Sequence, residues 1–156
     1  MRMSFRSGVG IAVALLVVGC AAAQTSTMSA ADAIAARQQL MKDQGAAMRS
    51  ISEKGKAGQI AAMAVDAEKL VETASRIPSL FPAGSVDPQK SRAKPEIWQK
   101  WSDFEGYAKT LNTKATQLAA TSRTGNAAAT TPLIADIGRT TCTACHDAFR
   151  GPEIKK

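Results

Sequence analysis

Apolar residues recur every three or four positions in four stretches of this chain, the spacing expected when one face of a helix is buried. The first stretch covers residues 29–53 and the second covers residues 59–76. Ser29 is placed to cap the first helix, because a serine oxygen accepts a backbone N–H of the first turn. Gly55 and Gly58 break the pattern between the two helices.

A long loop is expected next, over residues 78–95, because its prolines and glycine exclude a continuous helix. The third helix is expected from Pro95, a favoured first-turn residue, to about residue 122. Thr131 followed by Pro132 predicts the start of a fourth helix, which Gly151 ends.

Two short connections and one long connection between amphipathic helices predict an all-α, antiparallel four-helix bundle. Aromatic residues make up only 4% of the chain, and much of the apolar content is alanine, which has little bulk. Such a chain gains less from burying side chains, so a large buried cofactor would help to fill its core.

The formal net charge of +7 leaves the class of partner open. The basic residues are dispersed and lack interleaved aromatic residues, so nucleic-acid binding is not indicated. A modestly basic surface suits acidic partner proteins, and a solvated, lysine-rich surface explains the same charge.

Residues 1–23 have the pattern of a secretory signal peptide, which leaves a domain over residues 24–156. Arg2 and Arg6 precede an apolar run that is too short to span a bilayer comfortably. Three alanines then offer a cleavage site that ends at Ala23.

A second cleavage signal overlaps the first. The run Val-Val-Gly-Cys that ends at Cys20 is similar to the lipobox of bacterial lipoproteins, in which the cysteine becomes the lipidated first residue. Either signal predicts an exported protein, soluble in the periplasm or anchored there through Cys20.

Near the other end of the chain stands Cys142-Thr143-Ala144-Cys145-His146, the attachment signal of c-type haem. Each cysteine sulfur can add across a haem vinyl group, and the histidine then binds the iron. On a helix Cys142, Cys145 and His146 share one face, which lets a single helix hold one haem edge and the iron.

Two other chemistries use similar strings. A zinc site needs about four ligands, whereas this string supplies three, and the chain has no other histidine and no second Cys-x-x-Cys pair. A thioredoxin-like redox pair expects a preceding strand, and no convincing strand pattern is present. The string therefore predicts one covalently bound haem c.

A haem string at the C-terminal end of a four-helix chain resembles the cytochrome c′ family, the class II c-type cytochromes. Residues 37–45, the run Leu80-Phe81-Pro82, residues 92–98 and residues 145–150 are similar to family segments. The resemblance covers nearly all of residues 29–151.

The family has two branches, and the resemblance places this chain in the low-spin one. In that branch a methionine of the first helix is the sixth iron ligand, and Met41 stands at that position beside His146 as the proximal ligand. On spacing alone Met41 would be interpreted as core packing, and Met48 and Met63 are the other candidates.

Three further residues match family positions. Arg37 and Gln38 correspond to residues near the haem propionates, where a guanidinium would neutralise carboxylate charge. Arg150 corresponds to the basic residue one turn after the ligand histidine. Each of the three is equally well interpreted as a solvated surface residue.

Two functions follow from the resemblance, and neither is enzymatic. The first is a periplasmic electron carrier with a His/Met-ligated haem, which serves redox proteins of the periplasm or of a membrane electron-transport chain. The second is a five-coordinate, high-spin protein that binds nitric oxide or carbon monoxide; such members often form homodimers. Peroxidase-like catalysis is disfavoured, because the mature chain lacks a second histidine as distal acid-base group.

Overall fold

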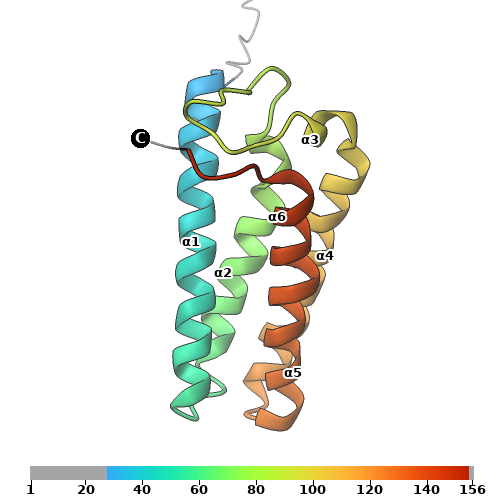
Figure 1. Ribbon diagram of the computed structural model, residues 1–156. Coiled ribbons are helices and arrows are strands. Elements are labelled where there is room, and N and C mark those ends of the chain that lie inside the picture. The colour runs from blue at the N-terminus through green and yellow to red at the C-terminus, as the bar shows by residue number, and fades with distance from the viewer. Residues whose placement is uncertain (1–27, 155–156) are drawn as a thin grey trace, which may run out of the picture.

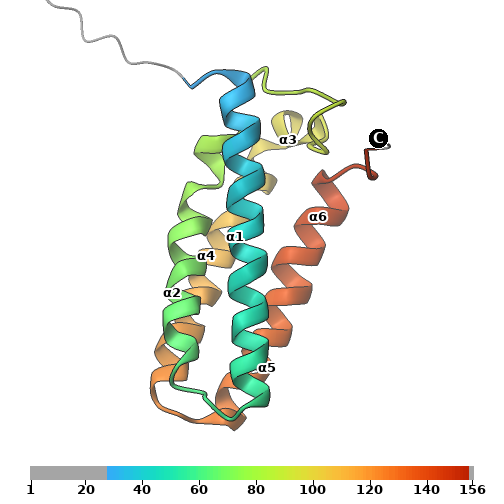
Figure 2. The same cartoon turned by 90° about the vertical axis from the view of Figure 1, so that its left-hand side faces the viewer.

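Four helical columns stand side by side in the computed structural model, which describes residues 28–154 (Figure 1). The columns are α1 (Ala30–Lys56), α2 (Met63–Arg76), α4 (Trp101–Arg123), and a last column of α5 (Ala127–Ile137), η2 (Gly138–Thr143) and α6 (Ala144–Phe149). Neighbouring columns run in opposite directions, so α1 begins at the end of the bundle where α6 finishes (Figure 2). The predicted all-α four-helix bundle is confirmed. The predicted signal peptide, with Cys20, lies outside the described residues.

The first helix starts where it was predicted to start. Ser29 Oγ accepts the backbone N–H of Asp32 at 3.1 Å and donates to the Asp32 carboxylate at 2.6 Å. The helix was predicted to end near residue 53, but it continues through Gly55 to Lys56. A Cβ atom at position 55 would lie 2.9 Å from Met63 Cε, so glycine here permits close packing of α1 on α2. Gly58, with φ +71°, makes the turn.

The second and third helices differ from their predicted bounds. Residues 59–62 form hydrogen-bonded turns, and regular α2 begins only at Met63. The third helix is interrupted at Lys100, which separates the short α3 (Glu96–Gln99) from α4. The interruption accompanies a long-range contact: the indole Nε1 of Trp98 donates to the carbonyl of Phe81 at 3.0 Å.

The predicted start of the fourth helix at Thr131 and Pro132 is wrong. The helix begins at Ala127, because Asn126 caps it: the side-chain oxygen accepts the N–H of Ala129 at 3.0 Å. Pro132 therefore lies inside α5. The cap at Asn126 therefore sets the start of the helix, and Pro132 does not.

The π-helical turn η2 was also not predicted, and it keeps one face of the last column buried. Ile137, Thr141, Cys145 and Phe149 are spaced by four, and in an α-helix each such step overshoots a full turn by about 40°. The wider turn of a π-helix reduces this drift. Ile137, Thr141 and Phe149 are accordingly all buried.

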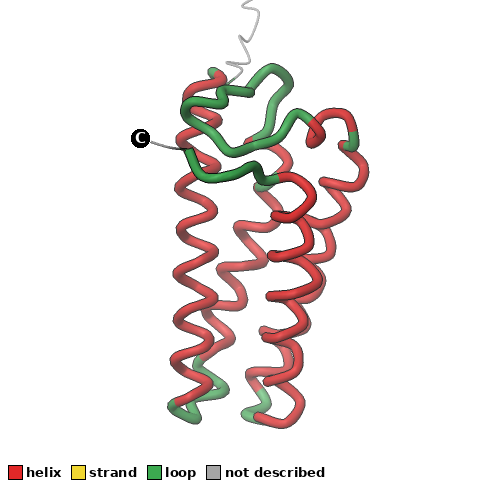
Figure 3. Tube along the Cα trace, viewed as in Figure 1, coloured by secondary structure: helices red, strands yellow, loops and turns green. Residues whose placement is uncertain are grey.

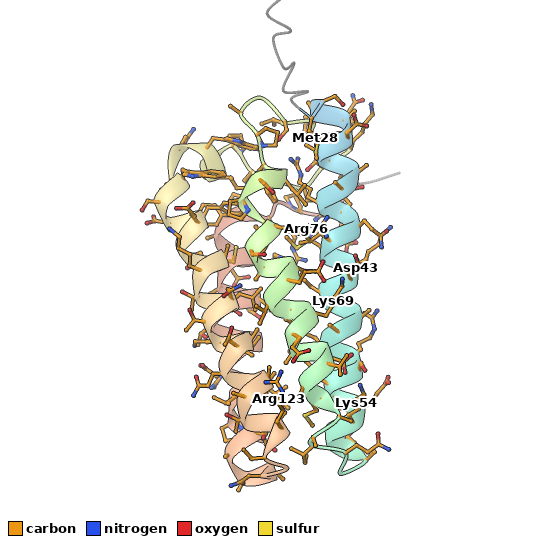
Figure 4. All side chains as sticks on the ribbon, turned by 180° about the vertical axis from the view of Figure 1, so that it is seen from behind. Met28, Asp43, Lys54, Lys69, Arg76 and Arg123 are labelled. Atoms are coloured by element: carbon orange, nitrogen blue, oxygen red, sulfur yellow. The ribbon has the colours of Figure 1, made fainter. Side chains whose placement is uncertain are left out.

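Charged side chains cover the outer faces of the columns (Figure 4). Lys54 of α1 pairs with Asp66 of α2 at 2.6 Å, and Arg123 of α4 pairs with Glu68 of α2. Both ion pairs join neighbouring columns. The Arg123–Glu68 pair is exposed and contributes little to stability, whereas the Lys54–Asp66 pair is partly buried. Within residues 28–154 no helix is both long enough and apolar enough to cross a bilayer.

The loop between α2 and α3 covers one end of the bundle (Figure 3). It starts with η1 (Pro78–Leu80) and ends beside the C-terminal segment that follows α6. Lys94 N–H donates to the carbonyl of Phe149 at 3.0 Å, and Gly151 N–H donates to the carbonyl of Arg92 at 2.7 Å. The loop and the end of the last column are therefore fixed to each other.

Candidate functional site

A cavity of about 620 Å³ lies between α1, α4 and the last column, below the covering loop. All seven site residues predicted from the sequence line it. They are Arg37, Gln38 and Met41 from α1, and Cys142, Cys145, His146 and Arg150 from the last column and the residue after it. The bundle thus brings together residues more than a hundred positions apart in the chain.

The haem-attachment string spans the junction of η2 and α6. Cys142 is the fifth residue of η2, and Cys145 and His146 lie in the first turn of α6. Both cysteines are free thiols and half-buried. Burial, together with Cys142, raises the pKa of the Cys145 thiol to about 11. A thiol held in this way stays protonated at neutral pH.

His146 is also half-buried. Burial lowers the pKa of its imidazole, and the positive charges of Arg150 and Arg92 lower it further. The neutral imidazole is the form that binds a metal, so these surroundings favour the ligand state of His146.

On the opposite helix Met41 supplies a thioether to the same cavity. Met48 and Met63, the other candidates from the sequence, do not line the cavity, and Met63 is fully buried in the core. Among these three methionines the geometry singles out Met41.

Arg37 is buried, with 3% of its surface exposed, and its guanidinium is bound to the covering loop. Nη1 donates to Ser85 Oγ at 2.8 Å, and Nη2 donates to the Ser85 carbonyl and to Ser91 Oγ, both at 2.7 Å. The guanidinium also stands 4.6 Å from the centre of the Phe81 ring. Burial lowers the pKa of Arg37. The contact with a haem propionate remains a prediction; the role of Arg37 in holding the loop was not predicted.

Gln38 and Arg150 lie near the same end of the cavity. Gln38 Nε2 donates to the carbonyl of Lys90 at 2.6 Å, so this side chain also engages the loop. Arg150 is exposed and pairs through its backbone with Ala93. The propionate contact predicted for Gln38 and the role predicted for Arg150 beside the ligand histidine remain predictions.

Some residues that line the cavity were not predicted from the sequence. Arg92 was noted only as part of a segment, yet it lines the cavity and its Nε donates to the carbonyl of Gly151 at 2.8 Å. Gln44 lies one helical turn after Met41, and its amide nitrogen is buried in the structure without a hydrogen-bond partner. Gln44 stands three residues after Met41 and therefore shares its face of α1, and this spacing could have predicted that Gln44 lines the cavity.

The cavity fits a haem. Apolar side chains from α3 and α4 form one wall, two thiols and an imidazole stand on one side, and a thioether stands on another. The residues of the apolar wall are Ile97, Phe104, Ala108 and Leu111. Within residues 28–154 no group of three or more histidine, cysteine, aspartate or glutamate side chains is arranged to hold a metal ion directly. Two thiols that can bond to haem vinyl groups and an imidazole that can bind iron are the donors that a haem c requires.

Comparisons with known proteins agree with this chemistry. The family model described as cytochrome C′ matches residues 32–150. A cytochrome c′ from Pararhodospirillum photometricum is 31% identical over 116 residues, which cover 73% of this chain and 92% of the relative. A cytochrome c′ from Rhodopseudomonas palustris is 32% identical over 162 residues, which cover 96% of this chain and 97% of the relative.

Solved structures share the fold. Cytochrome c′ from Thermochromatium tepidum superposes with a TM-score of 0.70 at 31% identity, over 81% of this chain and all of that one. A cytochrome c′ described for its ligand-controlled dimer dissociation superposes with a TM-score of 0.72 at 28% identity, over 80% of this chain and 98% of that one. A nitric oxide complex of a cytochrome c prime variant from Alcaligenes xylosoxidans superposes with a TM-score of 0.69 at 23% identity, over 80% of this chain and 98% of that one.

Proposed function

Because the chain belongs to the cytochrome c′ family, we propose that it carries single electrons through a haem c whose iron is bound by His146 and Met41. Members of this family are non-enzymatic haem proteins with one covalently attached haem c, and Cys142 and Cys145 fit its attachment site. The bound haem supplies an iron that cycles between the ferrous and ferric states.

The observation that supports this proposal is the presence of Met41 in the same cavity as His146. With a haem bound, the thioether of Met41 and the imidazole of His146 would both bind the iron, which would then have no free position for a substrate. Methionine favours ferrous iron relative to harder ligands and so raises the reduction potential. The bundle then serves to hold both ligands and to exclude water.

A second function is a five-coordinate haem that binds nitric oxide or carbon monoxide. The comparisons support it better than they support the electron carrier, since the relatives bear the name cytochrome c′ and a nitric oxide complex is among the similar structures. In this alternative Met41 only packs beside the haem.

The visible spectrum of the purified ferric protein separates the two functions. A low-spin spectrum with the weak far-red band of sulfur–iron ligation is expected for the electron carrier. A high-spin spectrum would instead identify the gas-binding protein.

We further propose that the protein is exported to the periplasm, where covalent haem attachment takes place in bacteria. Intact mass of the exported protein tests this. A chain that starts at Gln24 is a soluble periplasmic protein, and a chain that starts at an acylated Cys20 has a lipid anchor. An exported chain that retains Met1 would contradict the proposal.

The proposed partners are redox proteins of the periplasm or of a membrane electron-transport chain. A homodimer is the second proposed assembly, and one similar structure is described as a dimer that dissociates under ligand control. Sedimentation of the holoprotein with and without carbon monoxide tests it, because a dimer like that relative would change its mass on ligand binding.

A further inference from the structure

The helix that carries Cys145 and His146 is too short to be stable by itself. α6 has six residues, and it follows the π-helical turn η2. A helix of this length forms in water only when other parts of the fold hold it. Its last four carbonyls, which begin with that of His146, need partners from outside the helix. The groups that hold this end of α6 therefore affect where the imidazole lies.

Lys94 of the covering loop supplies two of these partners. Its backbone N–H donates to the carbonyl of Phe149 at 3.0 Å, and its Nζ donates to the carbonyl of Ala148 at 2.8 Å. The loop passes beside this end of α6 (Figure 1). A lysine ammonium suits the site, because the C-terminal end of a helix carries partial negative charge. Lys94 thus caps α6 from a position 54 residues before Ala148 in the chain.

The end of α6 that carries these carbonyls is also fixed by packing. The side chain of Phe149 is buried, and its ring centre lies 5.5 Å from that of Phe104 and 6.1 Å from that of Tyr107. The backbone N–H of Arg150 donates to the carbonyl of His146 at 2.9 Å. The backbone that follows His146 therefore has little freedom to rotate.

The stretch of loop that contains Lys94 is held in turn by α1. Ser91 Oγ accepts a hydrogen bond from Arg37 Nη2 at 2.7 Å, and it accepts another from the N–H of Ala93 at 3.2 Å. Residues 91–94 therefore bridge α1 and α6. Because this bridge is anchored on α1, Lys94 holds the end of α6 from a fixed position.

We propose that Lys94 is a positioning residue for the haem iron: by capping α6 it sets the angle at which the imidazole of His146 binds. Lys94 does not line the haem cavity, so it acts through the helix rather than on the haem itself. The proposal rests on the haem and on the ligand role proposed for His146. It does not require Met41 to bind the iron.

The test uses holoprotein with Met41→Ala, in which His146 is the protein ligand of ferrous iron whether or not Met41 binds iron in the wild type. Lys94→Met is added to this background, because it keeps the aliphatic stem and the backbone N–H and removes the ammonium. Resonance Raman spectroscopy of the ferrous protein measures the iron–imidazole stretching band. Denaturant unfolding of the same proteins measures their stability.

Lys94→Met should broaden the iron–imidazole band and move it to lower frequency, because an imidazole that is free to tilt makes a weaker bond to iron. Lys94→Arg, which keeps a long cationic donor, should return the band towards its position in the Met41→Ala protein. A lysine that only stabilised the fold would lower the free energy of unfolding when replaced and would leave the band in place.

Lys109→Met is the matched control in the same background. Lys109 is exposed, and its Nζ also donates at 2.8 Å, but to Glu105 of its own helix α4. Its replacement should leave the band unchanged. An unchanged band in Lys94→Met would overturn the proposal, and so would a Lys94→Arg band that coincides with the Lys94→Met band.

These outcomes are distinct from those that bear on the proposed function. If the Met41→Ala protein shows no iron–imidazole band at all, His146 is not the ligand, and the positioning role falls with it. A wild type that is already high-spin would refute Met41 ligation and leave the test of Lys94 intact.

Discussion

Arg37 and Ser85 are joined by two hydrogen bonds although 48 residues separate them in the chain. Nη1 of the arginine donates to the serine hydroxyl at 2.8 Å, and Nη2 donates to the serine carbonyl at 2.7 Å. The Ser85 hydroxyl in turn donates to the carbonyl of Pro82 at 2.8 Å. The first helix therefore anchors the loop that covers the haem cavity.

Replacing Arg37 with methionine should destabilise the protein by about 2–4 kcal/mol. The change keeps an aliphatic stem but leaves the buried hydroxyl and carbonyl of Ser85 without a charged donor. Denaturant unfolding measures the loss. Arg49→Met, at an exposed position of the same helix, should stay within about 0.5 kcal/mol of the wild type. Equal stability of the two variants would show that the loop does not depend on Arg37.

The sequence could predict seven of the residues that line the cavity, but not the others and not the contacts of Arg37. Cys142, Cys145 and His146 form a local string. Met41 was predicted from the resemblance of residues 37–45 to a family segment, since spacing alone would place it in the core. The partners of Arg37 lie in an irregular loop, where no periodic pattern predicts which carbonyl or hydroxyl meets the first helix.

The same limit explains the errors in the helices. The π-helical turn before the haem string is a local departure that hydrophobic spacing does not reveal. Asn126 is one of several polar residues before the last column that could cap it, and Thr131 with Pro132 gave a similar signal. The free energies of two such helix starts differ little, so tertiary packing decides which residue begins the helix.

Asp136 should stabilise the fold in a pH-dependent way. Its carboxylate accepts a hydrogen bond from Lys114, and this bond holds the pKa of Asp136 below its usual value. A carboxyl with a lowered pKa stabilises the folded state above its ordinary pKa, and this contribution is lost as the pH falls from about 4. Asp136→Asn should therefore unfold at a lower temperature than the wild type at pH 7.

The difference between Asp136→Asn and the wild type should shrink as the pH falls from about 4 towards 2. Thermal unfolding of both holoproteins at several pH values measures it. A difference that persists unchanged at low pH would mean that Asp136 acts through packing rather than charge.

The two cysteines should attach the haem independently. Cys142→Ala or Cys145→Ala alone should leave one thioether, so haem should survive acid-acetone extraction and add its mass to the chain. The double variant should lose its haem under the same treatment, although His146 can still bind the iron. Haem that extracts freely from the wild type would refute covalent attachment.

Met41→Ala should change the spectrum and ligand chemistry of the haem if the Met41 sulfur binds the iron. The far-red band should disappear, and the ferric protein should become high-spin or bind water. The ferrous protein should bind carbon monoxide readily, and the reduction potential should fall, because a ligand that favours ferrous iron has been removed. The variant should still fold, with a loss of about 2–5 kcal/mol if the cavity stays empty.

Met48→Ala is the matched control for Met41→Ala. Met48 lies two turns further along α1, is half-buried against the core, and does not line the cavity. Its loss should lower stability and leave the spectrum unchanged. If Met41→Ala and the wild type have identical spectra, Met41 is a packing residue. A wild type that is high-spin would then assign the protein to the gas-binding branch.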